Sequence, residues 1–243
     1  MIKTINNVSV NYIDFGQGDN TLVLLHGWGQ NIDMMKPIGN KFKKNNRVII
    51  IDLPGFGMSE EPTYVWNLKD YVICIKELLD KLEVEKPILI GHSFGGKISL
   101  LYASMYEVEK LVLFGSPFKQ EIKKISMKTK ILKGLKKVPL LNKLEGFAKK
   151  HIGSTDYKQA SETMRKIMVE HVNLDITEEV KKIKASTLLV WGTMDQEVPI
   201  ERAYELEKLI EDAAVIPYEG CSHYAYLERI DQTINIIKNF IGG

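Results

Sequence analysis

The sequence predicts an α/β fold, in which helices cover both faces of a mainly parallel β-sheet. Short apolar runs with the length of buried strands alternate with segments of helical periodicity along most of the chain. Turn residues bound most of these runs, as expected for strands that enter and leave a buried sheet. The eight expected strands, the first two forming an antiparallel edge, are residues 2–5, 8–15, 21–25, 48–52, 88–90, 110–114, 188–191 and 214–218.

The helical segments follow from apolar spacing and divide the chain into a core and an insertion. The clearest helix spans residues 68–82, with Asn67 at the position of an N-cap, and a final helix over residues 226–240 would pack beside the sheet. After the sixth strand, only helical patterns occur until the sheet resumes. We therefore expect a core of residues 1–117 and 184–243, with a helical cap inserted at residues 118–183.

A serine stands where the fifth expected strand turns into a helix. Ser93 lies between Gly91 and Gly95, at two positions where a side chain would collide as strand and helix close on each other. Such a bend lifts the serine hydroxyl from the backbone and places it at a helix N-terminus, where unpaired N–H groups favour a developing oxyanion. The pattern predicts that Ser93 is a nucleophile.

Two residues with the chemistry to assist Ser93 follow later strands. A serine hydroxyl needs a histidine to accept its proton and a carboxylate to orient that histidine. Asp195 follows the strand at residues 188–191, and His223 follows the strand at residues 214–218. Glu197 is the only close competitor for the carboxylate, because the loop after the preceding strand contains none.

Four ordered motifs resemble those of the α/β-hydrolase superfamily over nearly the whole chain. Besides the serine turn, they are Leu24–Gly29 (LLHGWG), Asp52–Ser59 (DLPGFGMS), Trp191–Asp195 (WGTMD) and Gly220–His223 (GCSH). The resemblance implies the α/β-hydrolase fold with a helical cap that roofs the nucleophile. It also implies a catalytic triad, which here is Ser93, Asp195 and His223.

The same resemblance assigns the oxyanion hole to the backbone N–H groups of Trp28 and Phe94. Two departures affect the shape of the histidine loop: Ser222 stands where the family often has glycine, and residues 225–226 replace a step that more often contains proline. The serine nucleophile argues against the dehalogenases and epoxide hydrolases of the family, which use aspartate there. We expect substrate contacts from Trp28, Met34, Met35 and Phe118.

The other histidines are expected to be structural. In the family motif, His26 supports the oxyanion loop, and His92 is expected to pack within the serine turn rather than take part in chemistry. His151 and His171 fall in the cap without a partner pattern, which predicts surface positions.

Composition is that of an ordinary globular enzyme: 44% of the residues are hydrophobic, 26% are charged, and the net charge is +2. There is no apolar leader or membrane-length apolar run, and the two cysteines, Cys74 and Cys221, do not suggest a disulfide framework. A cytoplasmic location is therefore expected. No Cys/His spacing suggests a metal, and Gly55 and Gly57 lack the third glycine of a dinucleotide fingerprint, so no cofactor is expected.

The cap is unusually basic. Residues 119–150 contain eleven lysines and two glutamates. This segment is either a solvated helix face or a docking surface for an acidic partner, such as an acidic carrier protein or an anionic lipid surface, or for a substrate carboxylate. Under the docking hypothesis, reversing Lys133, Lys136 and Lys137 to glutamate would weaken turnover of carrier-bound substrates.

These observations favour a serine hydrolase that cleaves a carboxylic ester of a small molecule through an acyl-enzyme intermediate. Two alternatives use the same triad: a carbon–carbon bond hydrolase, and an esterase for acyl methyl esters on acyl carrier protein. The second is suggested by residues 26–31, which resemble a loop of pimeloyl-carrier methyl esterases. A non-enzyme alternative is a receptor-like protein that keeps the fold to hold a ligand, whereas no feature indicates nucleic-acid binding.

Overall fold

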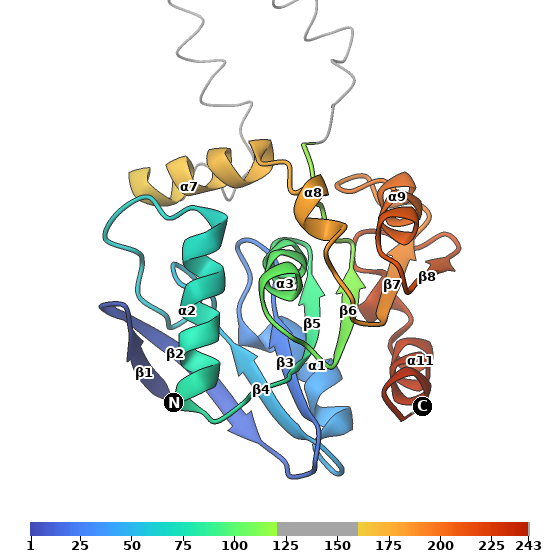
Figure 1. Cartoon of the computed structure of the whole chain (residues 1–243), viewed down its shortest axis with the longest axis horizontal. Coiled ribbons are helices and arrows are strands. Elements are labelled where there is room, and N and C mark those ends of the chain that lie inside the picture. The colour runs from blue at the N-terminus through green and yellow to red at the C-terminus, as the bar shows by residue number, and fades with distance from the viewer. Residues whose placement is uncertain (121–159, 243) are drawn as a thin grey trace, which may run out of the picture.

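The computed structural model describes residues 1–120 and 160–242 (Figure 1). Its centre is one eight-stranded sheet with the order β1-β2-β4-β3-β5-β6-β7-β8. Strand β2 is antiparallel to both of its neighbours, β1 and β4, and all the other neighbouring pairs are parallel. The strands are β1 Ile2–Ile5, β2 Val8–Phe15, β3 Thr21–Leu25, β4 Arg47–Ile51, β5 Ile88–His92, β6 Lys110–Phe114, β7 Thr187–Gly192 and β8 Ala213–Tyr218. The predicted sheet is confirmed.

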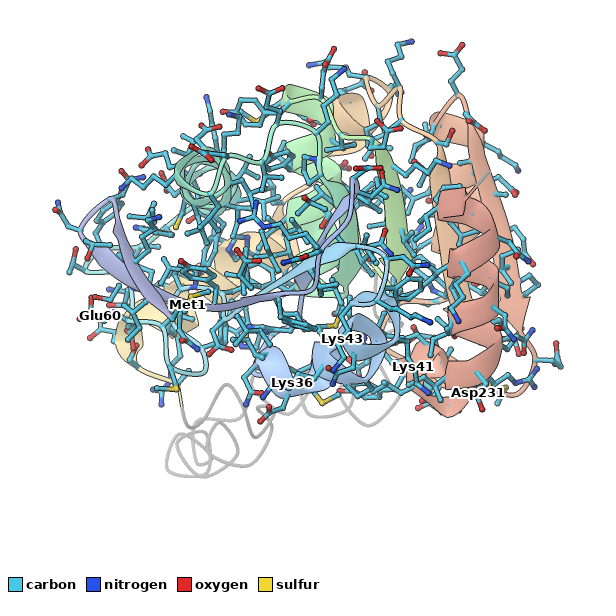
Figure 2. All side chains as sticks on the ribbon, turned by 90° about the horizontal axis from the view of Figure 1, so that it is seen from below. Met1, Lys36, Lys41, Lys43, Glu60 and Asp231 are labelled. Carbon is cyan, nitrogen blue, oxygen red and sulfur yellow. The ribbon has the colours of Figure 1, made fainter. Side chains whose placement is uncertain are left out.

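Helices cover both faces of this sheet. On one face, α2 packs against α3, which also contacts α8; on the other face, α1 and α10 contact α11. In Figure 2, where the molecule is seen from below, Lys36 and Lys41 of α1 and Asp231 of α11 lie at the periphery. The described helices are α1 Ile32–Phe42, α2 Leu68–Lys81, α3 Phe94–Met105, α7 Glu162–Asn173, α8 Thr177–Val180, α9 Glu201–Leu209, α10 Ala225–Glu228 and α11 Ile230–Gly242.

Two apolar clusters form the core, one on each face of the sheet. Val23 and Leu25 of β3 belong to the cluster beneath α2 and α3, whereas Leu22 and Leu24 belong to the cluster beneath α1 and α11. Alternate residues of a pleated strand point to opposite faces, so each strand contributes to both clusters. This is why the central strands are apolar along their whole length.

The helix boundaries agree with the sequence at α2 and differ near the C-terminus. Asn67 caps α2 by accepting a hydrogen bond from the backbone N–H of Asp70, and the Asp70 carboxylate accepts one from the Asn67 backbone N–H. The prediction of a single final helix at residues 226–240 is wrong, because two helices, α10 and α11, occupy this part of the chain. Arg229 has non-helical backbone angles and separates α10 from α11, while its guanidinium donates to the carbonyl of Glu219 at 2.6 Å.

Between β6 and β7, the described part of the predicted cap contains α7 and α8. In Figure 1, α7 lies across the end of the sheet at which the parallel strands finish. Of the eleven lysines in residues 119–150, all but Lys119 lie outside the described residues, so the docking hypothesis stays a prediction. Lys119 is described, and it forms an ion pair with Glu205 at 2.7 Å.

Candidate active site

The three residues expected to form the triad follow strands that end at the same edge of the sheet. Ser93 follows β5, Asp195 lies three residues after β7, and His223 lies five residues after β8. Strands β5, β6, β7 and β8 are consecutive neighbours and parallel, so their carboxyl ends share that edge. In α/β sheets this edge is the usual place for a ligand site.

Ser93 occupies a strained turn. Its φ is 49° and its ψ is −112°, a backbone conformation that residues other than glycine rarely adopt. A Cβ at Gly91 would lie 2.6 Å from the Cα of Gly96, and a Cβ at Gly95 would lie 2.4 Å from the carbonyl oxygen of Leu25. Both expected close approaches are therefore present, and they leave no room for side chains beside the serine.

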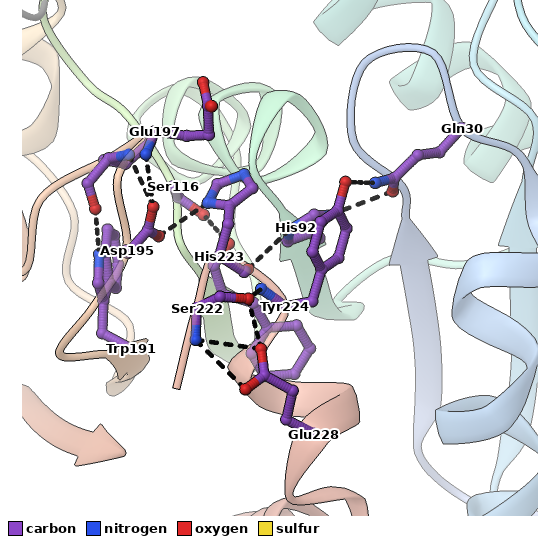
Figure 3. A network of polar contacts seen from close by, with 12 residues as sticks. Gln30, His92, Ser116, Trp191, Asp195, Glu197, Ser222, His223, Tyr224 and Glu228 are labelled. Atoms are coloured by element: carbon purple, nitrogen blue, oxygen red, sulfur yellow. Dashed lines mark hydrogen bonds and ion pairs between the residues drawn. The ribbon is translucent and has the colours of Figure 1, made fainter. Parts of the chain in front are cut away.

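Asp195 and His223 are hydrogen-bonded, with 2.7 Å between His223 Nδ1 and Asp195 Oδ2 (Figure 3). The other carboxylate oxygen, Oδ1, accepts from the backbone N–H groups of Glu197 and Val198, both at 2.9 Å. The Glu197 side chain is exposed, and its backbone holds Asp195 in place. Asp195, not the competing Glu197, is thus the carboxylate that is hydrogen-bonded to His223.

The loop that carries His223 is fixed by two further features. Gly115 has a φ of +50°, and a Cβ there would lie 2.8 Å from His223 Nδ1, so only glycine leaves space for the imidazole. Ser222 is hydrogen-bonded to the Glu228 carboxylate through its hydroxyl, and its backbone N–H donates to the same carboxylate at 3.0 Å. Ser222, at the position where the family often has glycine, thus links the histidine loop to α10 through these hydrogen bonds.

His26 is a buried structural residue beside the loop that contains Trp28. It is completely buried; Nε2 accepts from the Leu53 backbone N–H at 3.0 Å, and Nδ1 lies 2.7 Å from the carbonyl oxygen of Gly27. Burial lowers the pKa of His26 to about 4, so the ring is neutral at pH 7. The neutral tautomer with a proton on Nδ1 satisfies both contacts.

Gln30 joins three loops of the site, and sequence reasoning missed it. Its Oε1 accepts from the Gly27 N–H at 3.0 Å and lies 3.2 Å from His92 Nδ1, while its amide nitrogen donates to the Tyr224 hydroxyl at 3.3 Å (Figure 3). His92 Nε2 in turn lies 3.2 Å from the carbonyl oxygen of His223. His92 therefore packs in the serine turn, as expected, and also links that turn to the histidine loop.

Aromatic rings surround the residues expected to form the oxyanion hole. The ring of Trp28 lies 5.2 Å from that of Phe94 and 4.8 Å from that of Phe56, in edge-to-face arrangements. Phe94 is the first residue of α3, where a backbone N–H has no partner within the helix. The assignment of the two N–H groups to an oxyanion hole stays a prediction.

Two residues that were not expected at the site are part of this region. His171 is 4% exposed, so the prediction of a surface position is wrong; its ring lies 4.5 Å from that of Phe94. Met164, Ile167 and His171 form the buried face of α7, and their spacing along the helix is the sequence feature that reveals it. Lys97, which sequence reasoning did not single out, is 2% exposed and donates to the carbonyls of His171 and Leu174, both at 2.6 Å.

The expected substrate contacts are only partly at this site. Trp28 lies against Phe94, but Met35 is completely buried in the cluster on the opposite face of the sheet, so its placement in a pocket is wrong. The reason is that α1 turns its apolar face, including Met35, toward the sheet. Met34 is half-buried and Phe118 is buried in the same cluster as Phe94, and their contact with substrate stays a prediction.

Two features are absent from the described residues. No group of three or more His, Cys, Asp or Glu side chains in the described part of the chain could hold a metal ion. Among the described helices, none has the length and apolar character needed to cross a membrane.

Comparison with known proteins adds an independent result. Residues 20–127 match the family model described as alpha/beta hydrolase fold. A protein of Paraburkholderia phymatum named 2-hydroxy-6-oxononadienedioate/2-hydroxy-6-oxononatrienedioate hydrolase is 28% identical, over 96% of this chain and 91% of its own length. A bacterial membrane phospholipase A has a similar structure, with a TM-score of 0.80 at 24% identity, covering 100% of this chain and 85% of that one. The structure of an esterase from Exiguobacterium antarcticum is also similar, with a TM-score of 0.78 at 22% identity, covering 100% of this chain and 98% of that one.

The sheet order, the helices on both faces and these structural similarities define an α/β-hydrolase fold. The chain belongs to the α/β-hydrolase superfamily, and it is an enzyme of the hydrolase class.

Proposed function

We propose that this enzyme is a serine hydrolase that cleaves a carboxylic ester through an acyl-enzyme intermediate. The observation that carries the proposal is the hydrogen bond of 2.7 Å between Asp195 and His223, at the sheet edge where Ser93 occupies a strained turn. A carboxylate on Nδ1 leaves Nε2 of the imidazole to accept a proton, which is the arrangement that activates a serine hydroxyl.

In the proposed mechanism, the Ser93 hydroxyl attacks the ester carbonyl carbon as His223 Nε2 takes its proton. Asp195 stabilises the resulting imidazolium and keeps the ring in orientation. The backbone N–H groups of Trp28 and Phe94 stabilise the negative charge on the tetrahedral oxygen. His223 then protonates the leaving alcohol, and a water molecule releases the acid from Ser93 by the same sequence of steps.

A second candidate function is hydrolysis of a carbon–carbon bond. The observation that favours it is the name of the Paraburkholderia phymatum relative, a hydrolase of 2-hydroxy-6-oxo dioates, although its identity to this chain is 28%. The same triad would serve that reaction. Esters are preferred here because the proposed groups suffice for ester cleavage without any further residue.

The test compares the two substrate classes on one enzyme preparation. We expect release of p-nitrophenol from esters of acetate to decanoate, and labelling of Ser93 by a fluorophosphonate. A 2-hydroxy-6-oxo-2,4-dienoate, whose cleavage removes its conjugated absorbance, should turn over with a lower kcat/KM. A higher kcat/KM for the dienoate would assign carbon–carbon hydrolysis, and labelling at another serine would overturn the proposed nucleophile.

A further inference from the structure

The described residues contain a buried imidazole with no hydrogen bond. His171 is 4% exposed, and neither of its ring nitrogens has a hydrogen-bond partner among the residues that the structure describes. An unpaired polar group in the interior destabilises the folded state, so native proteins rarely retain one without a purpose. Nothing in the mechanism proposed above uses this ring.

The surroundings of His171 place it next to the reaction centre. Its ring lies 4.5 Å from that of Phe94, 5.4 Å from that of Tyr71 and 6.3 Å from that of Trp28, measured between centroids. Phe94 and Trp28 are the two residues whose N–H groups are proposed to hold the oxyanion. The imidazole therefore lies among aromatic rings, and small-molecule sites are usually lined by such rings together with a few polar groups.

The position of the ring is set by its helix, not by a hydrogen bond of its own. Lys97, four residues after Ser93 on the chain, donates to the backbone carbonyl of His171 and to that of Leu174, both at 2.6 Å. These bonds fasten the C-terminal end of α7 to α3, the helix that begins beside the nucleophile. The backbone of His171 is thus held while its ring nitrogens stay available.

The charge state of the ring defines the kind of group it would bind. Burial, and secondarily the charge of Lys97, lowers the pKa of His171 to about 3. The imidazole is therefore neutral at pH 7, with one N–H donor and one acceptor. A neutral ring suits an uncharged oxygen, because a buried carboxylate would need a cation as its partner.

From this geometry we infer that His171 is a specificity-determining residue, which hydrogen-bonds an uncharged oxygen on the acyl part of the substrate. The aromatic rings of Trp28, Tyr71 and Phe94 would contact the carbon skeleton of the same acyl group. The preferred substrates are accordingly esters of oxo or hydroxy acids rather than of plain fatty acids. This inference rests on the proposed ester hydrolysis.

Matched pairs of p-nitrophenyl esters test the inference, for example hexanoate with 5-oxohexanoate and pentanoate with 4-oxopentanoate. The wild-type enzyme should prefer the oxo member of at least one pair. His171→Phe keeps an aromatic ring but removes both nitrogens, and it should lower kcat/KM for that oxo ester about tenfold. For the plain partner, which has no oxygen for the imidazole to bind, kcat/KM should fall less than for the oxo ester.

Two conservative variants are the matched controls. His171→Asn and His171→Gln each offer a donor and an acceptor, and at least one of them should restore part of the preference for the oxo ester. The inference would be overturned if the wild-type enzyme had the same kcat/KM for both members of every pair. It would also be overturned if the ratio of kcat/KM for the oxo ester to that for the plain ester were the same in His171→Phe as in the wild type. A preference for the ester of a dicarboxylic acid that disappears in His171→Phe would also overturn it, since the bound group would then be charged.

The plain esters separate this result from a failure of the proposed function. If the wild-type enzyme hydrolyses plain esters and the fluorophosphonate still labels Ser93 in His171→Phe, the variant is folded and ester hydrolysis stands. A change in the ratio then reports on His171 alone.

Discussion

Two regions of this molecule that meet at the proposed active site are held together by different forces. Asp195 and His223 are bonded to each other, and two backbone N–H groups hold the second carboxylate oxygen. Phe94 and His171 meet through ring packing at 4.5 Å, and the nitrogens of His171 lack partners among the described residues.

The difference follows from what each region has to do. Proton transfer through a histidine requires one fixed geometry, and charge-assisted hydrogen bonds in a buried place provide it. A substrate contact requires groups that can exchange protein neighbours for the ligand, and aromatic walls with an unpaired polar atom meet that requirement.

The largest effect is expected from Ser93→Ala. Removing the nucleophile should lower kcat about 10⁶-fold, as the loss of one triad member does in other serine hydrolases. The fold should persist, because the hydroxyl contributes little packing. Steady-state turnover of a p-nitrophenyl ester and circular dichroism provide the two measurements, and near-normal turnover would contradict the assignment.

The next largest effect is expected from Asp195→Asn. The amide cannot stabilise the imidazolium and favours the wrong tautomer of His223, so kcat should fall about 10⁴-fold. Glu197→Gln is the matched control, since the Glu197 side chain is exposed and only its backbone supports Asp195. Equal losses in the two variants would mean that the carboxylate of Asp195 has no special role.

Acid should destabilise the protein through its buried imidazoles. Burial lowers the pKa values of His26 to about 4, of His171 to about 3, and of His92 well below the ordinary value of 6.5. Below pH 6.5 the unfolded chain binds these protons and the folded chain does not, so the free energy of unfolding falls as the pH is lowered toward 4. Each ring contributes about 1.4 kcal/mol per pH unit.

Urea unfolding at a series of pH values measures this slope. His171→Phe should reduce the slope by one proton while the contributions of His26 and His92 stay. An unchanged slope in that variant would show that His171 is already protonated, or exposed to water, in the folded enzyme.

The smallest effect is expected at alkaline pH. Burial lowers the pKa of Lys97 to about 8, against 10.5 for an ordinary lysine. Between these values the unfolded chain carries a proton that the folded chain has lost, so Lys97 increases the free energy of unfolding as pH rises. The increase, about 1.4 kcal/mol per pH unit, should be absent in Lys97→Met and present in Lys69→Met, which alters an exposed lysine of α2. The same slope in both variants would assign the titration to another group.

The sequence by itself determined the sheet and the catalytic candidates. Parallel strands that are buried on both faces must be continuously apolar, so the apolar runs in the sequence show where these strands lie. The glycines around Ser93 and the placement of Asp195 and His223 after later strands are likewise local features. The N-cap residue of α2 and the spacing of its apolar residues predict that helix from the sequence.

Only the tertiary structure decided what surrounds those residues. Gln30 and Tyr224 are hydrogen-bonded although 194 positions separate them, and no local pattern predicts such a contact. Met35 lies on the opposite face of the sheet because the apolar face of α1 packs there. His171 is buried because α7 packs on the aromatic rings beside Ser93. Burial of a polar side chain depends on what packs over it, and residues distant in the chain determine that packing.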